Sequence, residues 1–150
     1  MSEIADAVIR KAFFNDQLND LELAIVKERV EIRDFSDGEP ILTMQDASFP
    51  IVALVSGQVT VVSQFGEIIN VINTGTLFGE IAFLDRQTRT ADVVSKGDAQ
   101  VVFLSEDLIS HLEKDHPEMV SQLLLAIARG LCSKLRSAQR MMDASNFSFA

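Results

Sequence analysis

Residues 75–91 read Gly-Thr-Leu-Phe-Gly-Glu-Ile-Ala-Phe-Leu-Asp-Arg-Gln-Thr-Arg-Thr-Ala and stand apart from the rest of the chain. An apolar stretch ends near Phe78, and Gly79 to Leu84 can then form one or two turns of helix, with Glu80 in the first turn. Glycine has no Cβ, so a ligand can approach the backbone closely there. The unpaired N–H groups of a first helical turn can hold an anion. The segment therefore predicts a strand, a glycine turn and a short helix around an anion site.

Two charged side chains extend the chemistry of this segment. Arg89 follows the predicted helix and can offer a two-pronged donor to a phosphate. A carboxylate such as Glu80 is not expected beside a phosphate unless it binds another group of the ligand. It could accept hydrogen bonds from a sugar hydroxyl. Phosphate donors together with one carboxylate acceptor describe a nucleotide site. The structural alternative is an ion pair between Glu80 and Arg89, with Gly79 making a turn and no ligand involved.

The chain around this segment changes its hydrophobic period. From Val30 to Leu104 apolar residues alternate or form short runs, which favours strands. The strand candidates are Val30/Ile32, Ile41-Leu42, Ile51 to Val55, Val59/Val61, Ile68/Val71 and Val101 to Leu104. Turn signals separate them at the spacing of an antiparallel sandwich or barrel. These signals are Asp37-Gly38, Ser56-Gly57, Phe65-Gly66, Thr74-Gly75 and Gly97-Asp98.

Helical periodicity occupies both ends of the chain. Residues 3–28 read as helical pieces with a break at Asn15-Asp16. Ser105 to Asp107 is an N-cap region for a short helix to about residue 114. Pro117 opens a longer helix, whose apolar stripe is Val120, Leu124, Ile127, Leu131 and Leu135. We predict one mainly β domain over residues 1–150, with N-terminal helices, a β-roll at about 30–104 and two C-terminal helices at about 105–143.

Composition narrows the class of protein further. The 150 residues carry 22 Asp+Glu against 13 Lys+Arg, a net charge of -9, which disfavours direct DNA binding. The single cysteine, Cys132, excludes an intrachain disulfide and a Cys-ligated metal site built from this chain alone. The sequence has neither a secretory signal nor an apolar run long enough to cross a bilayer. We therefore expect a cytoplasmic protein with no membrane contact.

Residues 75–93 resemble the phosphate-binding cassette of cyclic nucleotide-binding domains of the catabolite activator protein type. The family pattern is Phe-Gly-Glu-aliphatic-Ala, then an arginine, two small residues and a strand. This chain has Phe78 to Ala82 and Arg89-Thr90-Ala91 at the matching distance. Val55 to Val59 resembles the family's Ser-Gly-x-Val hairpin. One departure is Gln45-Asp46, where the family usually has Gly-Asp, so that bend must form without glycine. The resemblance implies an antiparallel β jelly roll.

The resemblance also implies roles for the cassette residues. Gly79 and Ala82 would present backbone N–H groups near the phosphate and ribose. Glu80 would accept the ribose 2′-OH, and Arg89 would pair with the cyclic phosphate. The implied ligand-binding set is Phe78, Gly79, Glu80, Ile81, Ala82, Arg89, Thr90 and Ala91. A hydroxyl after the arginine often favours cGMP in this family, but it also occurs in cAMP-responsive members. We expect cAMP slightly over cGMP.

In the family the long C-terminal helix supplies a side chain that caps the base. By position the cap candidates are Leu131, Lys134 and Leu135, and the tail residues Phe147 or Phe149 could close the site instead. The same helix joins two chains in many relatives. The apolar stripe of residues 117–143 could therefore pack on the β-roll, form a homodimer, or do both.

These observations predict a non-enzymatic receptor for a cyclic purine nucleotide, with no further cofactor and no metal site. Nucleotide binding would reposition the C-terminal helices and so signal to an effector that the sequence does not name. Two alternatives stay open. One is the sensory half of a transcription regulator that lacks its DNA-binding domain. The other is an interaction module with this fold whose pocket binds no nucleotide.

Overall fold

The computed structural model describes residues 2–143. The N-terminal helical region consists of α1 (Glu3–Val8), a π-helical turn η1 (Ile9–Phe13) and α2 (Asp20–Lys27). The break before α2 is confirmed, because Asn15 and Asp16 both take positive φ values, 53° and 59°. The helix α2 begins with a capping box, in which Asn19 Oδ1 accepts a hydrogen bond from Glu22 N at 2.8 Å and Glu22 Oε1 accepts one from Asn19 N at 3.0 Å.

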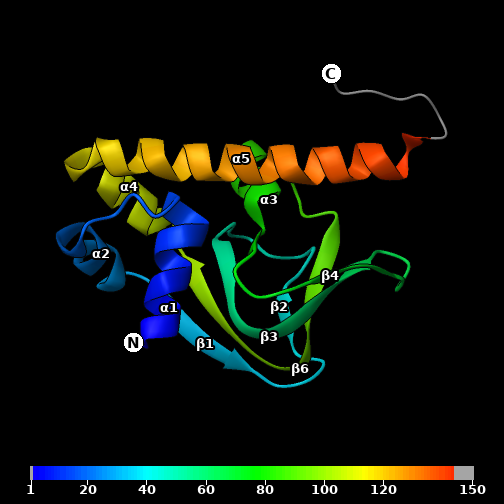
Figure 1. The fold of residues 1–150 in the computed structure, drawn as a ribbon. Coiled ribbons are helices and arrows are strands. Elements are labelled where there is room, and N and C mark those ends of the chain that lie inside the picture. Colours follow the sequence, from blue (N-terminus) through cyan, green and yellow to red (C-terminus); the bar gives the residue numbers. More distant parts are fainter. Residues whose placement is uncertain (1, 144–150) are drawn as a thin grey trace.

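Six strands form one antiparallel sheet behind these helices (Figure 1). They are β1 (Glu31–Phe35), β2 (Pro40–Leu42), β3 (Ile51–Ser63), β4 (Ile68–Ile72), β5 (Leu77–Phe78) and β6 (Ala91–Leu104). The order is β1-β6-β3-β4, with β2 also paired to β6 and β5 to β3. The two long strands pair from Ile51 opposite Leu104 to Ser63 opposite Ala91. This sheet with its flanking helices confirms the predicted antiparallel β-roll.

Two of the five predicted turns are wrong. Ser56-Gly57 and Gly97-Asp98 lie inside β3 and β6, which continue through them, although the β3–β6 register shifts on both sides of Ser56. Gly57 has a φ of +87°, and a Cβ there would lie 2.2 Å from Asp98 O. The glycine therefore lets the two strands approach closely at a bulge and does not end a strand. The hairpin expected at Val55 to Val59 is this bulge.

Three helices complete the fold: α3 (Glu80–Asp85), α4 (Glu106–Asp115) and α5 (Pro117–Met141). The predicted cap of α4 is confirmed, because Ser105 Oγ accepts a hydrogen bond from Leu108 N at 3.2 Å. Figure 1 shows α5 crossing one end of the molecule, with α3 between it and the strands. No helix among residues 2–143 combines the length and the apolar character that a membrane span requires.

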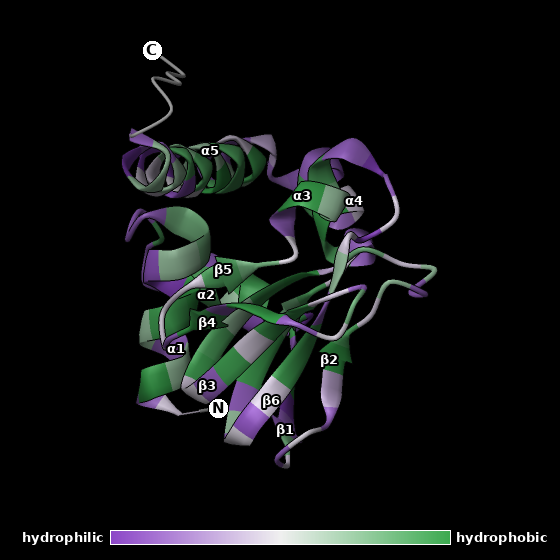
Figure 2. Cartoon of the chain, turned by 90° about the vertical axis from the view of Figure 1, so that its right-hand side faces the viewer, coloured by the Kyte–Doolittle hydropathy of each residue, from purple (hydrophilic) through white to green (hydrophobic). Residues whose placement is uncertain are grey.

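The core has two parts because alternate residues of β3 point to opposite sides of the sheet. Ile51 and Ala53 face the cluster that the N-terminal helices, α4 and α5 cover, whereas Val52 and Leu54 face the inside of the roll. Figure 2 shows the apolar segments along β3 and β6. In α5 the buried residues are Met119, Val120, Leu123, Ala126 and Ile127. Leu124 and Leu135 of the predicted stripe are 45% exposed, so these two residues do not pack on the rest of the chain as the other stripe residues do.

Candidate functional site

The turn at Gly79 is made by a left-handed residue that joins β5 to α3. The predicted strand end near Phe78 and the short helix after it are confirmed, and Gly79, with a φ of +81°, is the N-cap residue of α3. A Cβ at this position would lie 2.8 Å from Leu42 Cδ1 and 3.0 Å from Arg89 Nη1. Both the backbone conformation and the packing therefore require glycine. The chain thereby brings the first turn of α3 directly beside the arginine.

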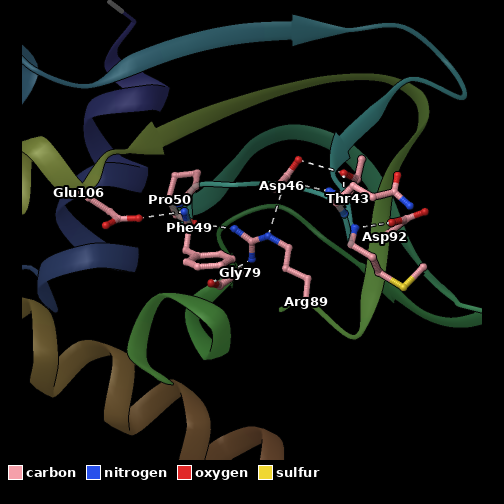
Figure 3. Close-up of polar contacts among 10 residues, drawn as sticks. Thr43, Asp46, Phe49, Pro50, Gly79, Arg89, Asp92 and Glu106 are labelled. Carbon is pink, nitrogen blue, oxygen red and sulfur yellow. Dashed lines mark hydrogen bonds and ion pairs between the residues drawn. The ribbon is translucent and has the colours of Figure 1, made fainter. Parts of the chain in front are cut away.

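Arg89 is buried behind this turn, and its residue surface is only 8% exposed. Its Nη1 donates to Gly79 O and its Nη2 to Pro50 O, both at 3.3 Å, while Nε lies 3.6 Å from Asp46 Oδ2 (Figure 3). Burial lowers the pKa of the guanidinium, whereas the carboxylates of Asp46 and Glu80 raise it. An arginine remains protonated in proteins. The site therefore contains a desolvated cation, a group that favours an anionic ligand.

The bend before β3 forms without glycine, as the Gln45-Asp46 departure requires. Asp46 Oδ2 accepts a hydrogen bond from Thr43 N at 2.9 Å, and its Oδ1 accepts one from Thr43 Oγ1 at 2.9 Å. Across the same loop, Asp92 Oδ1 accepts a hydrogen bond from Met44 N at 2.8 Å. Side-chain acceptors thus close the turn and hold Asp46 beside the arginine (Figure 3).

Glu80 is the second buried charge, with 4% of its surface exposed. It forms an ion pair with Lys134 of α5, whose Nζ also donates to Leu77 O at 3.2 Å. The ion pair between Glu80 and Arg89 proposed as the structural alternative does not form, because each side chain has other partners. The carboxylate of the cassette is thereby joined to the long C-terminal helix.

A pocket of about 730 Å³ connects these groups. Every residue of the predicted ligand-binding set lines it: Phe78, Gly79, Glu80, Ile81, Ala82, Arg89, Thr90 and Ala91. Of the cap candidates, Lys134 lines the pocket, whereas Leu131 packs against the helical core cluster and Leu135 lies at the surface. Phe147 and Phe149 lie outside the described residues. Among residues 2–143 there is no cluster of three or more His, Cys, Asp or Glu side chains that could hold a metal ion.

Sequence reasoning missed two walls of the pocket. One is β4, through Ile69, Asn70 and Val71, and the other is the face of α5 that carries Ser137, Ala138 and Met141. The α5 wall had a usable signal, because residues 134, 137, 138 and 141 recur at the spacing of one helix face. The β4 wall had none, since alternation alone does not say which side of an edge strand meets a cavity.

Known proteins share the sequence pattern and the fold of this chain. The sequence profile of the cyclic nucleotide-binding domain matches residues 32–116, more than half of the chain. The chain belongs to the cyclic nucleotide-binding domain family.

Among solved structures, the chain is similar to a cyclic nucleotide-binding domain from Methylobacillus flagellatus KT. The TM-score is 0.83 and the identity 17%, over 97% of this chain and 84% of that one. The structure of PKAR CBD2 with bound Sp-2Cl-cAMPS is also similar, with a TM-score of 0.64 and 18% identity over 99% of this chain and 93% of that one. At these identities the likeness concerns the fold.

Two curated proteins of Bradyrhizobium diazoefficiens are also similar in sequence. Glutaminase 1 is 30% identical over 81% of this chain, and Glutaminase 2 is 26% identical over 85%. The chain spans only 20% of the length of each of these relatives.

Proposed function

We propose that this chain is a non-enzymatic receptor that binds a cyclic purine nucleotide in the pocket between the cassette and α5. The observation that carries the proposal is the meeting of a buried cation, Arg89, and a buried carboxylate, Glu80, on one pocket. A cyclic nucleotide presents one anionic phosphate and one ribose 2′-OH, which match these two groups in charge and in hydrogen-bonding capacity. Thr90 lies beside Arg89 on the pocket wall.

The contacts of Glu80 support a way to transmit binding. Its carboxylate is paired with Lys134 of α5. A ribose hydroxyl that donates to Glu80 shares the carboxylate with the lysine, which contacts Oε1, so binding changes how firmly α5 is held on the cassette. The ligand then favours the arrangement of α4 and α5 in which it makes better contacts. We propose cAMP as the slightly preferred nucleotide.

We also propose partners for this chain, from the side chains that α5 exposes. The outward side of α5 exposes Leu124, Leu125 and Leu135, which are 45%, 48% and 45% exposed. These side chains are available for pairing of two chains through α5 or for an effector protein. We propose that the chain binds neither DNA nor a membrane and that it acts in the cytoplasm.

One observation favours a second candidate, an interaction module that binds no nucleotide. Arg89 and Glu80 both have protein partners already, so neither group needs a ligand to compensate its burial. A thermal-shift titration with cAMP, cGMP and 5′-AMP separates the two. A receptor melts at a higher temperature as the concentration of its cyclic nucleotide rises, and 5′-AMP has a smaller effect. A melting temperature that is unchanged by all three nucleotides favours the interaction module.

A further inference from the structure

Glu106, the first residue of α4, contacts two segments that lie next to Arg89 in space or in sequence. Its Oε1 accepts a hydrogen bond from the backbone N–H of Phe49 at 3.0 Å, and its Oε2 is paired with Arg86 Nη1. Phe49 belongs to the loop between β2 and β3, and Arg86 is the C-cap residue of α3. One carboxylate thus connects the loop before β3, the end of α3 and the start of α4.

The loop that Glu106 holds is also a loop that holds Arg89. Pro50 O accepts a hydrogen bond from Arg89 Nη2 at 3.3 Å, and the guanidinium carbon lies 5.7 Å from the centroid of the Phe49 ring. Figure 3 shows Glu106, Phe49, Pro50 and Arg89 in succession. In the middle of the same loop, Asp46 lies 3.6 Å from Arg89 Nε. The guanidinium therefore contacts this loop at two places, Asp46 and Phe49-Pro50.

Arg86 is the second partner of the Glu106 carboxylate. Its φ is 58°, a conformation that is uncommon for a residue other than glycine. In this conformation the Arg86 side chain pairs with Glu106, which lies 20 residues further along the chain. The carboxylate is thus bound both by the segment that leads from α3 toward Arg89 and by the loop that Arg89 contacts.

We propose that Glu106 is a positioning residue for the anion site, which fixes the loop at Phe49 and Pro50 and thereby sets where Arg89 lies on the pocket wall. This inference rests on the proposed function, because it names a residue that regulates the same site. A phosphate pairs best with Arg89 when this loop holds the guanidinium in place, so binding strengthens the contact between the Phe49 N–H and Glu106 at the start of α4. Coupling of this kind is reciprocal, so loss of the Glu106 contacts lowers nucleotide affinity.

The simpler role of an acidic residue in a first helical turn is a favourable interaction with the helix dipole. Asp107 shares this role, since it is the next residue of the same turn. It is exposed, and among the described residues its side chain makes no hydrogen bond or ion pair. Asp107→Ala is therefore the matched control for Glu106→Ala. Glu106→Gln is the conservative variant, because it retains an acceptor for Phe49 N–H and loses the charge that pairs with Arg86.

The experiment is calorimetric titration of the wild-type chain and the three variants with cAMP, and with cGMP if cAMP gives no heat. The temperature lies below the melting transition of every variant, so the fitted stoichiometry reports the folded fraction and Kd reports the site. We expect Glu106→Ala to weaken binding by at least about fivefold. Glu106→Gln gives a smaller loss, and Asp107→Ala leaves Kd unchanged. In parallel, cAMP slows hydrogen exchange of the Phe49 amide in the wild-type chain, and this effect is lost in Glu106→Ala.

The outcomes separate this inference from the proposed function. If the wild-type chain binds neither nucleotide, the proposed function fails and the inference fails with it. If the wild-type chain binds and Glu106→Ala binds equally tightly, only the inference is overturned. Equal losses in Glu106→Ala and Asp107→Ala also overturn it, because they assign the effect to charge at the start of α4. A change in stoichiometry with unchanged Kd identifies a purely structural role and has the same consequence.

Discussion

Replacement of Gly79 by alanine tests the geometry on which the anion site depends. With a φ of +81°, an L-residue here carries a left-handed penalty of about 1–2 kcal/mol. The added Cβ would also lie 2.8 Å from Leu42 Cδ1, 3.0 Å from Arg89 Nη1 and 3.2 Å from Pro50 O. Overpacking of this kind adds about 1–3 kcal/mol. We therefore expect Gly79→Ala to lower the free energy of unfolding by about 2–5 kcal/mol.

Gly66→Ala is the matched control for this variant. Gly66 has nearly the same φ, +80°, but a Cβ there would meet no atom within 4 Å. It carries the conformational penalty of about 1–2 kcal/mol without the packing penalty. The difference between the two variants therefore isolates the contacts with Leu42, Arg89 and Pro50.

Urea denaturation followed by circular dichroism measures both variants, with the m-value as a check that unfolding stays two-state. In Gly79→Ala the ends of the Leu42 and Arg89 side chains can move, whereas Pro50 O belongs to the backbone and yields less easily. Displacement of Arg89 also weakens binding of cAMP, while Gly66→Ala leaves it unchanged. Equal free energies of unfolding for the two variants would refute the packing argument. Unchanged cAMP affinity in Gly79→Ala would refute the role of this contact in placing the arginine.

Two further predictions concern the charges around the pocket. Lys134→Met leaves the buried Glu80 carboxylate without its cation, and we expect the free energy of unfolding in urea denaturation to fall by about 1–3 kcal/mol. The control is Arg136→Met, because Arg136 is an exposed cation on the same helix. An equal loss of stability in the two variants would contradict the account. The hydrogen bond from Phe49 N–H and the ion pair with Arg86 lower the pKa of Glu106. Its contribution to stability is therefore complete above the unfolded pKa of about 4.3 and is lost as the pH falls through the lower folded value. The stability difference between wild type and Glu106→Gln should shrink over this acidic range, and a difference independent of pH would exclude the charged form as its cause.

Much of the cassette could be predicted because its signals are local. Phe78, Gly79 and Glu80 are adjacent in sequence, and a glycine between a short strand and a helical run indicates a turn. The cap at Ser105 is local in the same sense, because its side chain and its backbone partner, Leu108 N, lie three residues apart. Short-range sequence signals were therefore sufficient to predict which residues gather at this pocket.

The two mistaken turns arose because one signal has two structural meanings. A glycine with positive φ can end a strand or form a bulge inside one, and Gly57 does the second. The atom that distinguishes the cases is Asp98 O on the paired strand, which lies far along the chain. The buried face of α5 was predicted only in part for a similar reason. Leu123 and Leu124 are both leucines, and only the packing of α5 in the cluster with the N-terminal helices and α4 determines that Leu123 is buried.

The electrostatic partners of the site were beyond the reach of sequence reasoning. Lys134 and Glu80 are separated by 54 residues, Arg89 and Pro50 by 39, and Glu106 and Phe49 by 57. The sequence offers each of these charged side chains several possible hydrogen-bond or ion-pair partners, and the fold determines which of them lies close. The acidic composition gave no indication that the anion site depends on one buried arginine held by backbone carbonyls.

The central claim is that this pocket binds a cyclic nucleotide through Arg89. The most direct test is calorimetric titration of cAMP and cGMP into the wild-type chain and into Arg89→Ala. The account predicts saturable binding by the wild type and a loss of at least about tenfold in the variant, because a charge-assisted pair with the phosphate is removed. Equal affinity in the two chains, or no binding of either nucleotide by the folded wild type, would contradict it.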